Sequence, residues 1–142
     1  MPTLISRSPS ETEALGAALA RTAAPGMVFG LVGPLGAGKT QFARGVARGL
    51  GIAGRIPSPT FALVQTHAGG RLPLHHLDLY RLERAEEIHA AGLDEFVPDA
   101  AAVTVVEWFD RWPGAPPPRL VRVTFEPAGD AERRITHDDP RA

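Results

Sequence analysis

The stretch GPLGAGKT at residues 33–40 directly follows the apolar run MVFGLV at residues 27–32. It matches the phosphate-binding pattern GxxxxGK(S/T) in full, with Lys39 and Thr40 at the last two positions. A buried strand before the loop and a helix after it form the context that this pattern requires. We therefore predict a phosphate-binding loop, or P-loop, between a strand and a helix.

Each residue type in this loop suits a nucleoside triphosphate. Glycines let the backbone curl so that successive N–H groups point at phosphate oxygens, and the following helix adds its positive dipole end. The lysine can reach the β- and γ-phosphates, and the threonine hydroxyl can bind Mg²⁺. The predicted nucleotide-binding residues are Gly33, Leu35, Gly36, Ala37, Gly38, Lys39, Thr40 and Gln41.

The composition favours this function over a chance Gly-rich turn. Of fifteen basic residues, fourteen are arginines and the single lysine is Lys39. Lysine is a compact point charge and arginine a wide planar fork, so the two are not equivalent beside phosphate. The chain contains no asparagine, which excludes the Asn-Lys-x-Asp element by which GTPases recognise guanine. ATP is therefore the predicted nucleotide.

Length and composition limit the class of protein. A chain of 142 residues favours one domain over residues 1–142, with a frayed tail at 138–142. The absence of cysteine excludes disulfides, and no apolar run approaches the ~18 residues of a membrane span. The N-terminal segment lacks the apolar core of a signal peptide, so we expect a cytoplasmic protein. A net charge of -1 argues against autonomous nucleic-acid binding.

The order of predicted elements indicates an α/β protein. Ser10 and Glu13 form the expected capping box of the first helix. The expected elements are a strand at 3–6, a helix at 10–24, a buried strand at 27–32, a helix at 40–51, a hairpin within 56–80, helical structure at 83–97, and strands at 101–108, 119–127 and 132–138. We predict a P-loop NTPase-like three-layer sandwich with a mixed, partly antiparallel sheet.

Two acidic residues, Asp78 in HHLDLY and Glu107 in VTVVEW, each close an apolar stretch. An acid in such a place is costly unless it reaches water or has a function. P-loop enzymes need a carboxylate for Mg²⁺ at a strand end in the same crevice. We predict that Thr40, Asp78 and Glu107 bind Mg²⁺ and that both acids act in catalysis with Lys39. The alternative is that both are solvated strand ends.

The segment PSPTF holds two hydroxyl residues, Ser58 and Thr60, before the expected hairpin. Its prolines disfavour a helix. A hydroxyl here could sense Mg²⁺ or the γ-phosphate, as switch loops do, and ordinary turn chemistry is the alternative. Four histidines show no metal-ligand spacing and are expected to be structural; they are His67, His75, His89 and His137.

Five motifs together resemble one family. GPLGAGKT, PSPTFALV, HHLDLYRL, GLDEF and VEW, in this order and spacing, are similar to the bacterial tRNA threonylcarbamoyladenosine biosynthesis ATPases, the TsaE (YjeE) family. The resemblance extends from about residue 10 to the final hairpin. It implies a P-loop fold and a weak Mg²⁺-dependent ATPase. Lys39 and Thr40 would bind phosphates and Mg²⁺, and Asp78 and Glu107 would be the acids of metal binding and hydrolysis.

The resemblance also implies a partner. Family members work with the TsaB–TsaD pair, which transfers threonylcarbamoyl to the adenosine next to the tRNA anticodon (t6A), and their ATP cycle resets that complex between turnovers. Contact with tRNA would be indirect. Thr60 would belong to the switch-like loop, and Pro34 stands where the family usually has an acid. The candidate relay or interface residues are Ser58, Thr60, His76, Tyr80, Arg81 and Trp108.

The residues alone leave two other functions open. One is a small-metabolite kinase in which Asp78 is the base for an acceptor hydroxyl. The other is a nucleotide-sensing module that never hydrolyses ATP. The three functions differ in product, which is free phosphate, a phosphorylated acceptor, or none.

Overall fold

The structure is a computed structural model that describes residues 2–34, 36–54, 64–82, 84, 86–129 and 132–139. Within this part of the chain, the strands form one sheet in the order β1-β7-β6-β2-β5-β4-β3. The elements are β1 (Thr3–Ser6), α1 (Pro9–Ala20), β2 (Val28–Val32), α2 (Lys39–Gly49), β3 (Val64–His67), β4 (Leu74–Asp78), α3 (Glu86–Ala90), the 3-10 helix η1 (Leu93–Phe96), β5 (Val103–Glu107), the 3-10 helix η2 (Phe109–Arg111), β6 (Leu120–Pro127) and β7 (Arg133–His137).

The sheet is mixed, as predicted. β2 runs parallel to β5 and β6, and β4 runs parallel to β5. The pairs β3–β4, β6–β7 and β1–β7 are antiparallel. β2 is central in the sheet and apolar clusters cover it on both faces, so its sequence VFGLV is almost wholly apolar.

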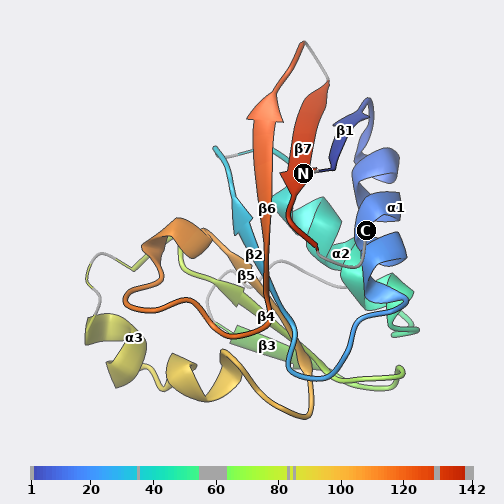
Figure 1. Cartoon of the computed structure of the whole chain (residues 1–142). Coiled ribbons are helices and arrows are strands. Elements are labelled where there is room, and N and C mark those ends of the chain that lie inside the picture. Colours follow the sequence, from blue (N-terminus) through green and yellow to red (C-terminus); the bar gives the residue numbers. More distant parts are fainter. Residues whose placement is uncertain are drawn as a thin grey trace.

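Helices cover both faces of the sheet, which gives the three predicted layers (Figure 1). α1 and α2 pack on one face, where Phe42 of α2 makes edge-to-face contacts with Phe29 and Phe125 at centroid distances of 6.0 and 5.9 Å. α3 and η1 lie on the other face, over a second apolar cluster that includes Leu77, Val106 and Ile88.

Glycines allow the backbones of α1 and α2 to approach closely. A Cβ atom added at Gly45 would lie 2.0 Å from the carbonyl oxygen of Glu13, and one at Gly49 would lie 2.3 Å from that of Ala17. On the opposite helix, a Cβ at Gly16 would lie 2.3 Å from the carbonyl oxygen of Phe42. The position of α2, and with it the end of the P-loop, is therefore set by backbone contact with α1.

The first helix begins earlier than the sequence predicts. Ser8, not Ser10, is the N-cap: its Oγ accepts a hydrogen bond from Glu11 N at 3.1 Å, and Glu11 Oε2 accepts one from Arg7 N at 2.7 Å. The prediction placed this capping box two residues too late. Pro9 explains the difference, because proline favours the first helical position, where its missing N–H is not needed.

Two other predictions need correction. The helical structure expected at 83–97 is divided into α3 and η1, with Gly92 in the left-handed conformation (φ 72°) between them. In the tail expected to fray at 138–142, Asp138 Oδ1 accepts a hydrogen bond from Arg122 N at 2.7 Å and Asp139 is buried. Asp138 is thus held by β6, and Asp139 N donates to His137 Nδ1 at 3.2 Å, whereas residues 140–142 lie outside the described residues. No helix in the described part of the chain is long and apolar enough to cross a membrane.

Candidate functional site

The P-loop leaves the central strand β2 at Val32 and enters α2 at Lys39. Gly36 (φ 77°) and Gly38 (φ 102°) adopt the left-handed conformation that favours glycine. Gly38 is the N-cap of α2 and provides no side-chain hydrogen bond to the first turn. The N–H groups of that turn are thus not capped by their own N-cap side chain, and they form the kind of helix end that binds phosphate.

The lysine of the loop is folded back over its own backbone. Lys39 Nζ donates hydrogen bonds to the carbonyl oxygens of Gly33 at 2.6 Å and Pro34 at 2.8 Å. It also lies 4.1 Å from the centroid of the Trp108 ring. Burial lowers the pKa of Lys39, and the negative charges of Glu107 and other nearby acids oppose this shift. The ammonium group is therefore positioned in a largely desolvated place.

Glu107 connects the P-loop helix to the sheet. The hydroxyl of Thr40 donates to Glu107 Oε1 at 3.1 Å and to Oε2 at 3.3 Å. Nε2 of His76 lies 2.5 Å from Oε2 of the same carboxylate. Glu107 and His76 are 3% and 0% exposed, so this carboxylate is buried but hydrogen-bonded from two sides.

Strand register explains why these residues meet. Glu107 ends β5 and is paired with Asp78 at the end of β4 on one side and with Leu31 near the end of β2 on the other. The carboxyl ends of three adjacent parallel strands therefore lie next to the P-loop. This edge of a parallel sheet is where open α/β folds bind their ligands.

Asp78 is only partly buried and bonds to its own turn. Its Oδ1 accepts a hydrogen bond from Tyr80 N at 2.9 Å. Burial raises the pKa of Asp78, and the negative charge of Glu107 adds to this rise, whereas the Tyr80 N–H, His76 and Lys39 oppose it. The two carboxylates are thus close enough for their charges to repel, which a bound cation would relieve.

Trp108 directly follows Glu107 in an unusual backbone conformation. Its φ of 59° and ψ of 44° are left-handed, and among the described residues it is the non-glycine residue with positive φ. Such a conformation costs on the order of 1–3 kcal/mol and tends to occur at functional sites. It turns the indole over Lys39 and toward Tyr80, whose ring centroid lies 5.1 Å away.

These side chains line a pocket of about 430 Å³. The residues that line it are Ser6, Ser8, Pro9, Thr12, Gly36, Ala37, Gly38, Lys39, Thr40, Gln41, Asp78, Tyr80, Glu107, Trp108 and Arg133. Most of the nucleotide-binding, metal and acidic residues predicted from the sequence are therefore brought together. Leu35, Ser58 and Thr60 lie outside the described residues, and the exposed Arg81 does not line this pocket.

Sequence reasoning missed two parts of the pocket wall. Where β1 ends and α1 begins, the hydroxyls of Ser6 and Thr12 lie 2.7 Å apart. From β7, Arg133 Nη2 donates to the carbonyl oxygen of Gly36 at 3.2 Å. The hydroxyl residues between β1 and α1 are visible in the sequence as possible polar ligands. That this segment and β7 both lie next to the P-loop depends on the order of strands in the sheet. His76 was predicted as a relay or interface residue, and its complete burial excludes the interface.

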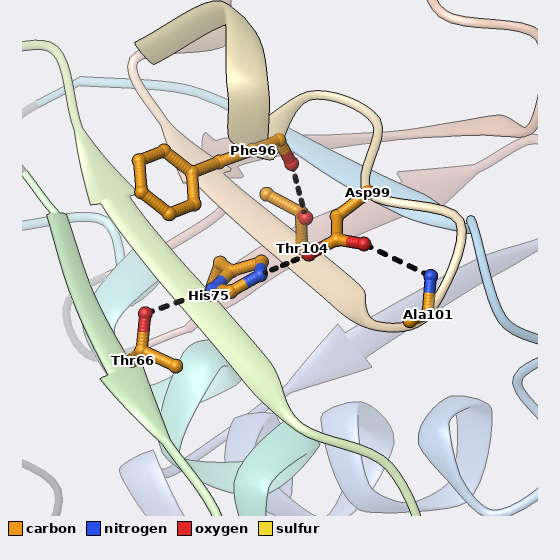
Figure 2. A network of polar contacts seen from close by, with 6 residues as sticks. All are labelled: Thr66, His75, Phe96, Asp99, Ala101 and Thr104. Atoms are coloured by element: carbon orange, nitrogen blue, oxygen red, sulfur yellow. Dashed lines mark hydrogen bonds and ion pairs between the residues drawn. The ribbon is translucent and has the colours of Figure 1, made fainter. Parts of the chain in front are cut away.

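The neighbouring His75 lies on the opposite face of the sheet (Figure 2). Its Nδ1 is 2.8 Å from Thr66 Oγ1, and its Nε2 is 2.8 Å from Asp99 Oδ2. Asp99 Oδ1 in turn accepts from Ala101 N at 2.9 Å. This network ties the β3–β4 hairpin to the segment before β5. No group of three or more potential metal ligands among histidine, cysteine and acidic residues occurs in the described part of the chain.

The oxygen donors of Thr40, Asp78 and Glu107 fit a small hard cation. Hydroxyl and carboxylate oxygens are the ligands that Mg²⁺ takes from proteins, usually one or two carboxylates together with substrate phosphates. All three side chains line the same pocket, and two of them already share a hydrogen bond. These residues could therefore hold Mg²⁺ beside a phosphate chain.

A strand, a loop with the GxxxxGK(S/T) sequence pattern and a helix in a mixed sheet, with acids at the ends of adjacent parallel strands, define a P-loop NTPase-like fold. The family described as "Threonylcarbamoyl adenosine biosynthesis protein TsaE" matches residues 6–135. The chain therefore belongs to the TsaE family, and the resemblance predicted from the sequence is confirmed.

Individual relatives agree with this assignment. A protein of Bacillus subtilis named tRNA threonylcarbamoyladenosine biosynthesis protein TsaE is 42% identical over 129 residues, which covers 91% of this chain and 80% of the relative. A protein of the same name from Treponema pallidum is 39% identical over 132 residues and covers 93% and 96%. The crystal structure of Bacillus subtilis YdiB matches with a TM-score of 0.75 at 36% identity, over 96% of this chain and 83% of that one.

Proposed function

We propose that this protein binds Mg-ATP and hydrolyses it slowly, as part of t6A synthesis in tRNA. The observation that carries the proposal is the meeting of Lys39, Thr40 and Glu107 in one pocket at the N-terminus of α2. Lys39 and Thr40 belong to the P-loop pattern, and Glu107 is a buried acid at the end of the separate strand β5. A loop that only turned the chain would have no need of that acid.

Each group in the pocket has a different role, which follows from its chemistry. The backbone N–H groups of the loop and the first turn of α2 bind phosphate oxygens. Lys39 exchanges its bonds with the loop carbonyl groups for bonds to the β- and γ-phosphates. Glu107 orients the attacking water and accepts its proton, since its carboxylate is held in one orientation within the pocket.

Mg²⁺, when bound, neutralises charge that develops on the phosphate oxygens. Thr40 and Asp78 are the residues that would hold the ion, and Glu107 lines the same pocket next to them. Burial raises the pKa of Asp78, which means that its negative charge is unfavourable in this place. A bound cation would compensate that charge, so Asp78 is suited to hold Mg²⁺.

Membership of the family supports the proposal of a partner. Relatives of this chain are named as proteins of tRNA threonylcarbamoyladenosine biosynthesis, and we place this protein with the TsaB–TsaD pair in the cytoplasm, in contact with tRNA only through that pair. ATP hydrolysis resets the complex between turnovers. Ser58 and Thr60 sense the γ-phosphate, and Tyr80, Arg81 and Trp108 pass the nucleotide state to the partner.

Phosphate release from Mg-ATP, measured with and without TsaB–TsaD, tests the proposal. We expect slow release by the protein alone and faster release with the pair. A phosphorylated small-molecule acceptor would instead show a kinase. Tight ATP binding without phosphate release under either condition would show a nucleotide-sensing module.

A further inference from the structure

Two adjacent histidines on β4 face opposite sides of the sheet, because successive side chains on a strand alternate. His75 faces the side that holds Thr66 and Asp99, where it completes a structural network. His76 faces the P-loop side and is fully buried. The function proposed above assigns no task to this second imidazole.

Strand register brings His76 to Glu107. His76 is paired with Val105 on the parallel strand β5, and Glu107 lies two residues further along the same face. The resulting distance from Nε2 to Glu107 Oε2 is 2.5 Å. The other carboxylate oxygen, Oε1, receives the hydroxyl of Thr40 at 3.1 Å. The carboxylate is thus held from the sheet on one side and from the P-loop helix on the other.

The second ring nitrogen indicates how the imidazole bonds. Nδ1 of His76 is buried and has no hydrogen-bond partner among the described residues. Gln65 lies opposite His76 on the neighbouring strand β3. Its Oε1 atom is also without a hydrogen-bond partner among the described residues, so it does not accept a hydrogen bond from His76 Nδ1. A buried N–H without an acceptor is unfavourable, so the hydrogen belongs on Nε2. His76 therefore donates to Glu107.

We propose that His76 is a positioning residue that holds Glu107 in the orientation needed for ATP hydrolysis. Lys39 lies in the same pocket and feels the charge of Glu107. Without the bond from His76, the carboxylate is free to turn toward that ammonium group and away from the attacking water. This inference rests on the proposed ATPase function and adds a residue to it.

Two substitutions separate positioning from packing. His76→Gln keeps an N–H donor near the place of Nε2, whereas His76→Leu fills the space without a donor. We expect His76→Leu to lower kcat for ATP hydrolysis by about 10- to 100-fold, the scale of a small misplacement in an active site. KM for ATP should change little, and His76→Gln should recover most of kcat. His75→Leu is the matched control on the other face, and it should lower Tm but leave kcat unchanged.

Nitrogen NMR of the imidazole rings provides a readout that needs no turnover. The His76 signal, identified by its loss in His76→Gln, should show the tautomer with hydrogen on Nε2. The Nδ1–H tautomer would overturn the proposal, and so would a folded His76→Leu protein with wild-type kcat or a folded His76→Gln protein as slow as His76→Leu. If the wild type itself releases no phosphate, the ATPase proposal fails, while the NMR result still decides whether His76 donates to Glu107.

Discussion

The hydroxyl of Thr40 lies 3.1 Å from Oε1 of Glu107, although 67 residues separate the two in the chain. One residue belongs to the first turn of the P-loop helix, and the other ends the strand beside it. Under the proposed function, this hydrogen bond joins the part of the site that would bind phosphate to the part that would act on water. Substitutions on either side of it should therefore affect binding and turnover differently.

Lys39→Ala should remove most of the affinity for nucleotide and leave the fold intact, since Nζ bonds to the loop and not to the core. A ligand at ~100 times its Kd stabilises a protein by about 2.7 kcal/mol. In thermal unfolding, Mg-ATP should raise Tm clearly for the wild type and little for the variant. Arg84→Ala, which removes an exposed cation away from the pocket, should keep the wild-type response. Equal shifts in Lys39→Ala and wild type would contradict the role of Lys39.

Glu107→Gln should bind Mg-ATP but hydrolyse it ~10²–10⁴-fold more slowly, the usual effect of losing a positioned acid–base group. An amide oxygen in the place of Oε2 can still accept from His76 Nε2 and from the Thr40 hydroxyl, which lies 3.3 Å from that oxygen, so the local structure should persist. Phosphate release and nucleotide titration measure the two effects separately. If this variant supports many rounds of t6A formation with TsaB–TsaD, ATP hydrolysis does not reset the complex.

Asp78→Asn should stabilise the free protein and impair its function. Because burial raises the pKa of Asp78 in the folded state, its charge opposes folding at neutral pH, and this penalty disappears as the pH falls below the unfolded value of 3.8. The asparagine keeps an oxygen for the Tyr80 N–H. We expect a higher Tm at pH 7 together with weaker Mg²⁺-dependent ATP binding.

The exposed Asp110 near Lys39 offers the control for this variant. Asp110→Asn should show neither the rise in Tm nor the loss of Mg²⁺ dependence. A lower Tm for Asp78→Asn with unchanged Mg²⁺ dependence would mean that Asp78 is a structural strand end.

The network around His75 predicts a different dependence on pH. The Ala101 N–H, and next to it the His75 side chain, hold the pKa of Asp99 below its ordinary 3.8. A lowered pKa stabilises the fold above 3.8, and the contribution is lost as the pH falls through the lower folded value. Asp99→Asn should therefore have a lower Tm than wild type at pH 6, and this difference should shrink below about pH 4. Glu126→Gln, at an exposed position on β6, should show no such trend.

Gly45→Ala tests the contact between α1 and α2. Alanine normally favours a helix over glycine by roughly 1 kcal/mol. Here its Cβ would lie 2.0 Å from the backbone oxygen of Glu13, and such overpacking costs roughly 1–3 kcal/mol or more. Packing should win, so Tm should fall. Ala18→Ser on the exposed side of α1 should change stability by less than about 0.5 kcal/mol. A stabilised Gly45→Ala protein would show that the helices can separate at little cost.

Much of the architecture could be predicted because it depends on local patterns. Alternating or continuous apolar residues identified the strands, and the ends of β1, β2, α2, β5, β6 and β7 differ from the predicted ranges by at most two residues. Predictions were wrong where two local signals competed. Ser8 before Pro9 caps α1 in place of Ser10, and Gly92 divides the helical pattern at 83–97.

The amino-acid sequence by itself determined the P-loop, since its glycines, Lys39 and Thr40 act within one short segment where spacing decides geometry. It also identified Asp78 and Glu107 as acids in unfavourable places. Only the tertiary structure decided which groups these acids meet. The bonds of Glu107 to Thr40 and His76, and of Arg133 to the Gly36 carbonyl, depend on strand order and register. Those are set by the packing of segments far apart in the chain, which no local pattern records.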